Sequence, residues 1–177
     1  GSLLELECRD LAIKTTVGRK STTYEKKKDS DIIKSIIGNY SGLTAKVNAT
    51  QTEWAEQVQY YVSDWDFILA RAETNGMIVT TLNGELAVFP PDKNTKAVLE
   101  IEYGNNLLEF NADLNSVNQL GSVDASSWDY KTQQVIDGKA NSSLSGPGNL
   151  STKKLSEVVG LKEYELQTSG PLQNADL

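Results

Sequence analysis

The sequence predicts an α+β fold in which short helices are mixed with antiparallel strands. Three observations lead to this prediction. Residues 63–76 have the pattern of a complete capped helix, residues 77–89 have that of a tight hairpin, and residues 99–114 alternate between apolar and polar side chains. Hydrophobic residues make up only 38% of the 177 residues, so we expect a modest core and many loops.

The first residues predict two short strands. Residues 4–8 alternate between apolar and charged side chains, as a half-exposed strand does, and we expect Cys8 to be a buried structural thiol within it. Residues 11–16 predict the second short strand. The polar residues 17–22 and the charge run 25–29 then indicate exposed loops.

A helix is predicted over residues 31–40. Asp29 or Ser30 can cap its first turn, and Gly42 closes it. Isoleucines recur at positions that share one side of a helix, which predicts an apolar stripe facing the core. A short strand over residues 43–47 is expected next.

The helix that follows residue 62 is predicted with both of its ends. Ser63 can accept a backbone N–H in the first turn, and Asp66, three residues on, completes a pair that resembles a capping box. Asp64 and Asp66 place negative charge at the positive end of the helix dipole, so we interpret them as helix-start residues rather than as an acid pair. Gly76 supplies the left-handed residue that ends the helix.

The spacing of apolar side chains predicts which face of this helix is buried. Apolar residues recur at helical intervals and are expected to pack on the core, and these are Trp65, Ile68, Leu69 and Ala72. Arg71 is expected at the surface or at the edge of the packing. Before the helix, residues 53–62 predict another short element. Its first part has apolar residues at helical spacing, and its last part suits an extended strand.

A β-hairpin is predicted directly after the helix. Residues 77–82 and 85–89 are apolar runs joined by Asn83-Gly84, the strongest short hairpin signal. Pro90-Pro91-Asp92 then stops the sheet and marks a boundary. We therefore predict an α/β subdomain over residues 1–92, a β-rich segment over 93–140, and a linker with a short helix over 141–177.

An acidic hairpin is predicted after this boundary, with strands over residues 99–103 and 108–114 and a turn between them. One face is apolar, and the other carries the carboxylates of Glu100, Glu102, Glu109 and Asp113. We interpret these carboxylates as a solvent-exposed face. A calcium site or a glycosidase pair would use the same residue types, but nothing else in the sequence supports either.

The rest of the chain predicts a strand, a turn and a helix. Residues 123–128 begin the strand, and Asp129 opens the turn. We expect Trp128 to be a core residue rather than a platform that stacks on a sugar. Residues 141–149 are rich in Ser, Gly and Pro and indicate a flexible linker, and residues 150–159 predict a short helix with a serine cap.

The composition argues against several classes of function. The chain has no histidine, which removes His-dependent catalysis and His-ligated zinc, and a single cysteine cannot form an internal disulfide. A net charge of −7 argues against nucleic-acid binding, which needs a basic face. No apolar run comes close in length to the stretch of about 20 residues that a membrane-spanning helix needs. The residues therefore indicate no active site, metal or cofactor.

Three stretches in collinear order resemble one known family. They are KTTVGRKSTTYEKKKDSDIIKSIIGNYSGL over residues 14–43, QVQYYVSDWDFILARAETNGMIV over 57–79 and VDASSWDYKTQQVI over 123–136. Together they resemble the VgrG spike proteins of bacterial type VI secretion and the related phage late-control and baseplate hub proteins. The motif residues expected to be structural determinants are Ser63, Asp64, Trp65, Asp66, Phe67, Arg71, Gly76, Trp128 and Asp129.

The resemblance implies a fold like that of a phage baseplate hub, in which an α/β subdomain with short helices is joined to an antiparallel, β-barrel-like tube subdomain. It implies a protein that is not an enzyme and needs no cofactor. Such a hub trimerises, caps the hexameric tail tube and delivers effectors. We expect this chain to be a central piece of one, without the first barrel and the spike.

The resemblance also implies partners and a location. The expected partners are further copies of the chain in a homotrimer, the hexameric tail-tube protein, baseplate proteins and effector proteins, with no nucleic acid and no stable membrane insertion. The hub is expected to assemble in the bacterial cytoplasm and then to be ejected to the extracellular space or the target cell. The acidic face of residues 100–113 is expected at the tube lumen or at subunit contacts.

Two alternatives stay open at this stage. A prophage or pyocin baseplate hub would carry the same motifs. A secreted carbohydrate-binding or carbohydrate-active module, which is a different class of protein, would use exposed aromatic and acidic side chains instead.

Overall fold

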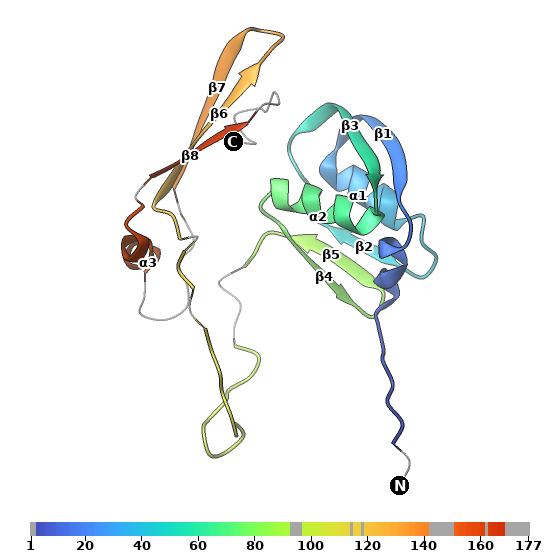
Figure 1. Ribbon diagram of the computed structural model, residues 1–177. Helices are drawn as coiled ribbons and strands as arrows, with labels where there is room; N and C mark the ends of the chain where they lie inside the picture. The colour runs from blue at the N-terminus through green and yellow to red at the C-terminus, as the bar shows by residue number, and fades with distance from the viewer. Residues whose placement is uncertain are drawn as a thin grey trace. The chain divides into compact units, whose positions relative to one another are not determined.

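The computed structural model describes residues 3–92, 97–113, 115–117, 119–141, 151–161 and 163–168. The chain forms two compact units, Gly1–Pro91 and Asp92–Leu177 (Figure 1). Helices and strands are mixed along the described residues, so the predicted α+β class is confirmed.

The first unit contains most of the regular structure. In chain order it has a 3₁₀ helix η1 (Leu11–Thr16), β1 (Lys20–Lys28), α1 (Asp29–Ile37), β2 (Thr44–Val47), β3 (Glu53–Val62), α2 (Asp64–Thr74), β4 (Ile78–Leu82) and β5 (Glu85–Phe89). Strands β1 and β3 form an antiparallel two-stranded ribbon. The other sheet has the order β2-β5-β4, and in it β2 runs parallel and β4 antiparallel to β5.

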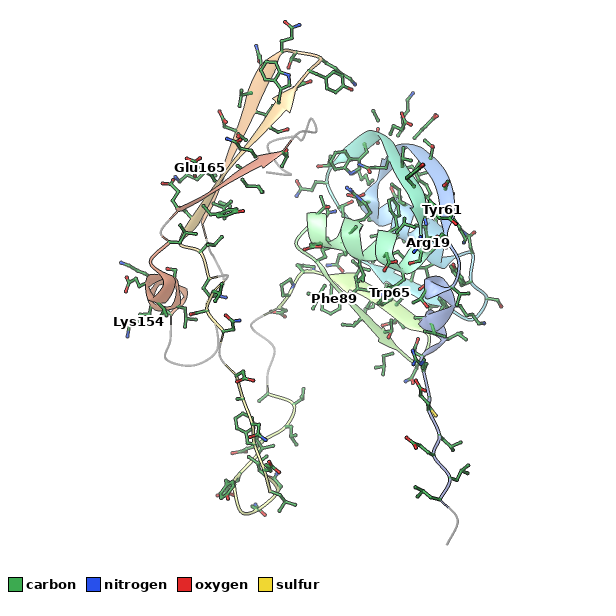
Figure 2. All side chains as sticks on the ribbon, in the orientation of Figure 1. Arg19, Tyr61, Trp65, Phe89, Lys154 and Glu165 are labelled. Atoms are coloured by element: carbon green, nitrogen blue, oxygen red, sulfur yellow. The ribbon has the colours of Figure 1, made fainter. Side chains whose placement is uncertain are left out.

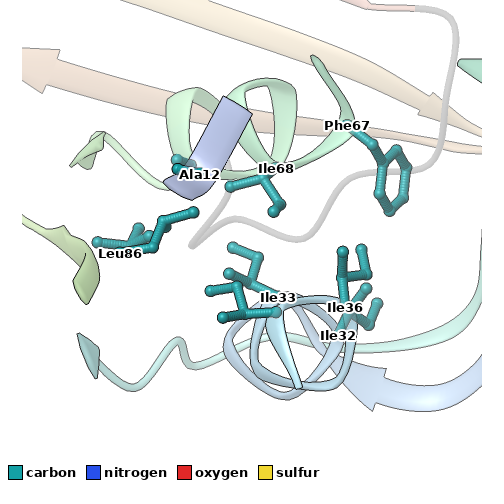
Figure 3. Packing of buried hydrophobic residues seen from close by; sticks show 10 residues of the cluster. Ala12, Ile32, Ile33, Ile36, Phe67, Ile68 and Leu86 are labelled. Carbon is teal, nitrogen blue, oxygen red and sulfur yellow. The ribbon is translucent and has the colours of Figure 1, made fainter. Parts of the chain in front are cut away.

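The two helices form a layer between the ribbon and the three-stranded sheet. Helix α1 lies against β1 and β2, and α2 lies against β3, β4 and η1. The core fills the space between these elements (Figure 3). Its buried members are Ala12, Ile32, Ile33, Ile36, Ile37, Phe67, Ile68, Ala72, Leu86 and Val88.

The elements predicted from local signals are present. The hairpin of β4 and β5 turns at Asn83 and Gly84, whose φ angles of 52° and 79° suit the tight turn that this residue pair favours. Helix α1 carries the isoleucine stripe, although it begins at Asp29 and so encloses both expected cap residues in its first turn. The Thr50 hydroxyl accepts from the Ser30 N–H instead, at 3.1 Å.

The predictions for the first 28 residues were wrong in three places. Residues 4–8 form no strand, their side chains are exposed, and Cys8 is exposed rather than buried. Residues 11–16 are a 3₁₀ helix because the Asp10 side chain accepts from the Ala12 N–H at 2.9 Å and caps it. The expected loop at 25–29 belongs largely to β1, which pairs with β3 along its length.

The second unit contains β6 (Ser122–Asp129), β7 (Gln134–Asn141), α3 (Thr152–Val159) and β8 (Glu163–Thr168). The strands form one sheet in the order β7-β6-β8, with β7 antiparallel and β8 parallel to β6. Strand β8 had no counterpart in the sequence prediction. The strands within the described ranges of this unit do not close into a barrel.

The predicted acidic hairpin does not form as a pair of strands. Over residues 97–113 the described backbone has one isolated bridge, between Tyr103 and Leu107. A two-stranded ribbon is at best marginally stable without a further layer to cover its apolar face. Leu114 and the predicted linker, 141–149, lie outside the described residues apart from Asn141, which ends β7.

Helix α3 matches its prediction. The Ser151 side chain accepts from the Lys154 N–H at 3.3 Å, and Gly160, at a φ of 78°, ends the helix in the left-handed conformation.

Candidate functional site

Helix α2 is the centre of the motif that the sequence singled out, and both of its predicted ends are present. The Ser63 Oγ accepts from the Asp66 N–H at 3.1 Å, and the Ser63 hydroxyl donates to the Asp66 carboxylate at 2.6 Å. The helix ends at Thr74, and Gly76 follows with a φ of 62°. These caps fix where α2 starts and stops between the two sheets.

A buried carboxylate lies at the start of α2. Asp64 is only 2% exposed, and its oxygens accept from Lys20 Nζ at 2.6 Å, from the Tyr40 hydroxyl at 2.6 Å and from Gln59 Nε2 at 2.8 Å. Gln59 is itself fully buried and also accepts from the Tyr24 hydroxyl. Asp64 therefore joins β1, β3 and the end of α1 to the N-terminus of α2.

A second buried carboxylate lies toward the other end of α2. Asp29 is 1% exposed and accepts from Arg71 through two hydrogen bonds, of 2.6 and 2.8 Å. The Trp54 indole N–H and the Asn75 amide each donate to it at 2.9 Å. The Arg71 guanidinium also lies over the Trp54 ring, 5.1 Å from its centre. Of the two expected places for Arg71, the surface is wrong and the edge of the packing fits, because 13% of its side chain is exposed.

Both carboxyls are held in the ionised form. Burial opposes ionisation of Asp64, but hydrogen bonds from Gln59, Lys20 and Tyr40 outweigh it, so the pKa of Asp64 lies below its usual value. Burial likewise opposes ionisation of Asp29, and hydrogen bonds from Arg71, Asn75 and Trp54 lower the pKa of that carboxyl. The hydrogen bond to Asp64 raises the pKa of Lys20.

The two clusters attach the β1–β3 ribbon and α1 to opposite ends of α2. Sequence reasoning missed five of their members, which are Lys20, Asp29, Tyr40, Gln59 and Asn75. Asp29 was visible only as a possible helix cap, and Asp64 only as a helix-start residue. Their cationic partners, Arg71 and Lys20, lie 42 and 44 residues away along the chain, so spacing along the sequence carries no signal for these ion pairs.

The aromatic residues of the motif differ in how deeply they are buried. Phe67 is buried and stacks on Tyr24, with ring centres 6.0 Å apart. Trp65 is half-buried and packs at the border of the core. The prediction of a core role for Trp128 was wrong, because 49% of its surface is exposed on β6. Asp129 opens the predicted turn and accepts from the Lys131 N–H at 2.8 Å.

The four acidic residues of the predicted hairpin are exposed, and their chain is largely without regular structure. Glu102 accepts from Asn105 at 3.3 Å and Glu109 from Asn111 at 3.1 Å, both over short sequence distances. Glu100 and Asp113 are exposed as well. Over the described ranges, no three His, Cys, Asp or Glu side chains are grouped closely enough to hold a metal ion.

The arrangement around α2 is suited to structure rather than to chemistry. Each buried carboxylate accepts several hydrogen bonds from donors of neighbouring elements, which leaves it engaged in holding those elements together. In the part of the chain that the structure describes, each helix is too short or too polar to cross a bilayer.

Acidification should destabilise the first unit. Both carboxyls have a lower pKa in the folded chain than the about 3.9 of the unfolded chain. Their contribution to the free energy of unfolding is therefore fully present above that unfolded pKa, and it is lost as the pH falls through the folded pKa values. Urea unfolding from pH 7 to about pH 2.5, followed by the fluorescence of Trp54 and Trp65 in a Trp128→Phe background, measures this. Asp64→Asn should flatten the profile, whereas the exposed Asp31→Asn should not. Equal profiles for the two variants would rule out a contribution from Asp64.

Comparisons with known proteins place the fold. A family model described as the Alg8 N-terminal domain matches residues 1–177. None of the curated proteins matches the chain in sequence. Among solved structures, the tail protein from Neisseria meningitidis MC58 is similar at a TM-score of 0.57 and 12% identity, over 93% of this chain and 49% of that one. The 43 kDa tail protein of prophage MuSo2 from Shewanella oneidensis is similar at 0.56 and 11%, over 91% of this chain and 44% of that one. The chain thus has a fold found in phage tail proteins and spans about half of their length.

Proposed function

We propose that this chain, which belongs to the Alg8 N-terminal domain family and has a fold found in phage tail proteins, is a structural hub segment of a contractile, phage-tail-like injection machine. The observation that carries the proposal is the match to two tail proteins over more than nine-tenths of this chain. The sequence of residues 57–79, one of the three stretches that together resemble VgrG spike proteins, supports the finer assignment to type VI secretion.

In this proposal the chain acts by assembly rather than by catalysis. Three copies form a homotrimer that caps the hexameric tail tube and contacts baseplate and effector proteins. The hub assembles in the bacterial cytoplasm and is ejected with the spike. Among the described strands, β7 and β8 each pair with β6 on one side only, and a strand in such a position can pair with a strand of a neighbouring chain. The exposed apolar side chains of residues 99–110 likewise support a role in contacts with other chains.

A prophage baseplate hub is the second candidate. One of the two similar structures is itself the tail protein of a prophage, and the tail-like fold is common to both candidates. The two candidates share the trimeric hub and differ in the tube protein that is bound.

Native mass and tube binding test the proposal together. We would compare this chain with a version extended on both sides to a full-length hub, using light scattering and co-purification with a hexameric tail-tube protein. The proposal expects a trimer of the extended protein that retains the tube protein. An extended protein that stays monomeric and does not retain the tube protein would refute it.

Reversing two charges of residues 98–113, which we call the acidic segment, should impair this assembly. Glu100→Lys combined with Glu102→Lys replaces two exposed carboxylates at the expected contact or lumen face, so binding to the tube should weaken by at least about tenfold. Pull-down titrations with the tube protein give the effect. The matched control is Glu73→Lys with Glu157→Lys, which reverses two exposed charges on helices. Unchanged binding of the first variant would place the acidic segment outside the contact.

A further inference from the structure

Strand β3 and the residue before β1 present a cluster of exposed aromatic, apolar and cationic side chains, which we call the tyrosine patch: Arg19, Val58, Tyr60 and Tyr61. Tyr60 is 81% exposed, Tyr61 64% and Val58 49%. Gln59 between them is fully buried, so Val58 and Tyr60 lie on the outward face of the strand. Tyr60 and Tyr61 therefore expose large aromatic side chains to solvent instead of packing them on the core.

A β-bulge sets the position of Tyr61. Thr22 pairs with Gln59 and Lys20 with Val62, so β3 has one residue more than β1 over this interval. Tyr61 has a φ of 46°, a left-handed conformation that is strained for a tyrosine, and its N–H donates to Ser21 Oγ at 3.1 Å. Bulges commonly redirect a side chain. The ribbon therefore displays Tyr61 at a position where glycine would be relaxed.

The patch also carries a positive charge. The Arg19 guanidinium lies 5.5 Å from the centre of the Tyr61 ring, and Figure 2 labels both residues on the ribbon. No carboxylate among the described side chains forms an ion pair with Arg19, whereas the neighbouring Lys20 is bound to Asp64. Tyrosine and arginine are enriched at the centres of protein interfaces, so the patch has the composition of a binding surface.

The chain contains a segment of complementary character. Residues 98–113, the acidic segment, include four carboxylates and no lysine or arginine. Its apolar side chains are exposed in the second unit, namely Leu99 (71%), Ile101 (49%), Tyr103 (80%), Leu108 (91%) and Phe110 (67%). Acidic and apolar side chains alternate along it, which suits a surface that offers one cation beside aromatic rings.

We propose that the tyrosine patch of one copy binds the acidic segment of a second copy of this chain. Arg19 pairs with Glu100 or Glu102, while Tyr60 and Tyr61 pack on the apolar side chains next to those carboxylates. The contact adds to the proposed hub function, on which it rests, by naming the two surfaces that meet between neighbouring copies.

The two surfaces belong to different units of the chain, so the contact joins unlike surfaces. A contact of acidic segment with acidic segment would be repulsive. Unlike surfaces can meet twice across a two-fold axis, or head to tail in a ring that closes when the rotation between copies allows. A trimeric hub is such a ring.

Charge reversal in two separate variants tests the proposal. Sedimentation analysis of the wild-type chain over a range of concentrations should show self-association that weakens with added salt. Arg19→Glu, or Glu100→Lys with Glu102→Lys, should each weaken it at least about tenfold. An equimolar mixture of the two should recover part of the association, because contacts between unlike variants regain opposite charges while a ring of three keeps one contact between like variants. Lys27→Glu, at an exposed position on β1 outside the patch, should leave self-association unchanged.

A third variant separates binding from folding. Tyr61→Gly relieves the left-handed strain, so its melting temperature should not fall, yet it removes the ring from the patch and should weaken self-association. The proposal is overturned if the wild-type chain stays monomeric at every concentration, if the mixture associates no better than its components, or if Tyr61→Gly associates like the wild type. Loss of tube binding with intact self-association would instead count against the proposed function alone.

Discussion

Arg71→Ala should lower the free energy of unfolding of the first unit by about 3–5 kcal/mol. The substitution removes the two hydrogen bonds and the positive charge that neutralise Asp29, a carboxylate whose side chain is only 1% exposed in the folded chain. It also removes the guanidinium from the face of Trp54. An uncompensated buried charge is among the largest penalties that a single substitution can introduce.

Chemical denaturation followed by Trp54 fluorescence measures this effect, because Trp54 belongs to the same cluster. Arg9→Ala is the control, since Arg9 pairs with Glu7 at the exposed surface, where ion pairs contribute little. The double variant Asp29→Asn with Arg71→Met should lose less stability than Arg71→Ala, because no buried charge remains unpaired. An Arg71→Ala protein as stable as Arg9→Ala would contradict the assigned role.

Ile68→Ala should cost about 2–5 kcal/mol in the same unit. Ile68 is fully buried on α2, between the isoleucines of α1 and Leu86 of the sheet, so its truncation leaves a cavity at the centre of the core (Figure 3). Leu69→Ala, one residue along the same helix, is the matched control because 39% of Leu69 is exposed. Urea unfolding of the two variants should differ clearly, and equal losses would mean that the core is not centred on Ile68.

The parts of the fold that could be predicted from sequence are those specified by neighbouring residues. Helix α2 has its cap, its apolar face and its stop within residues 63–76, and the β4–β5 turn depends on Asn83 and Gly84 alone. Strand β1 shows the opposite case. Its charged sequence indicates a loop, and it becomes a strand only because β3 pairs with it after a separation of more than 20 residues.

The same distinction applies to the candidate site. Ser63 and Asp66 were predictable because they bond to each other across one helical turn. The roles of Asp64 and Asp29 depend on partners brought in by tertiary folding, so the sequence showed only two carboxylates near helix ends. Residues 4–8 and 99–114 show the converse error, because alternation predicts a strand only where another strand or layer completes it.

The tight turn of the β4–β5 hairpin bears on the chemical ageing of the protein. An asparagine followed by glycine is prone to deamidation, in which the backbone nitrogen of the second residue attacks the asparagine side chain and releases ammonia. Here that nitrogen belongs to Gly84, which is buried and donates its proton to the Asp10 carboxylate at 3.1 Å. A nitrogen whose proton is held by a carboxylate is harder to deprotonate and to bring to the side-chain carbon. The carboxylate that caps η1 with one oxygen therefore also protects Asn83 from this slow covalent damage with the other.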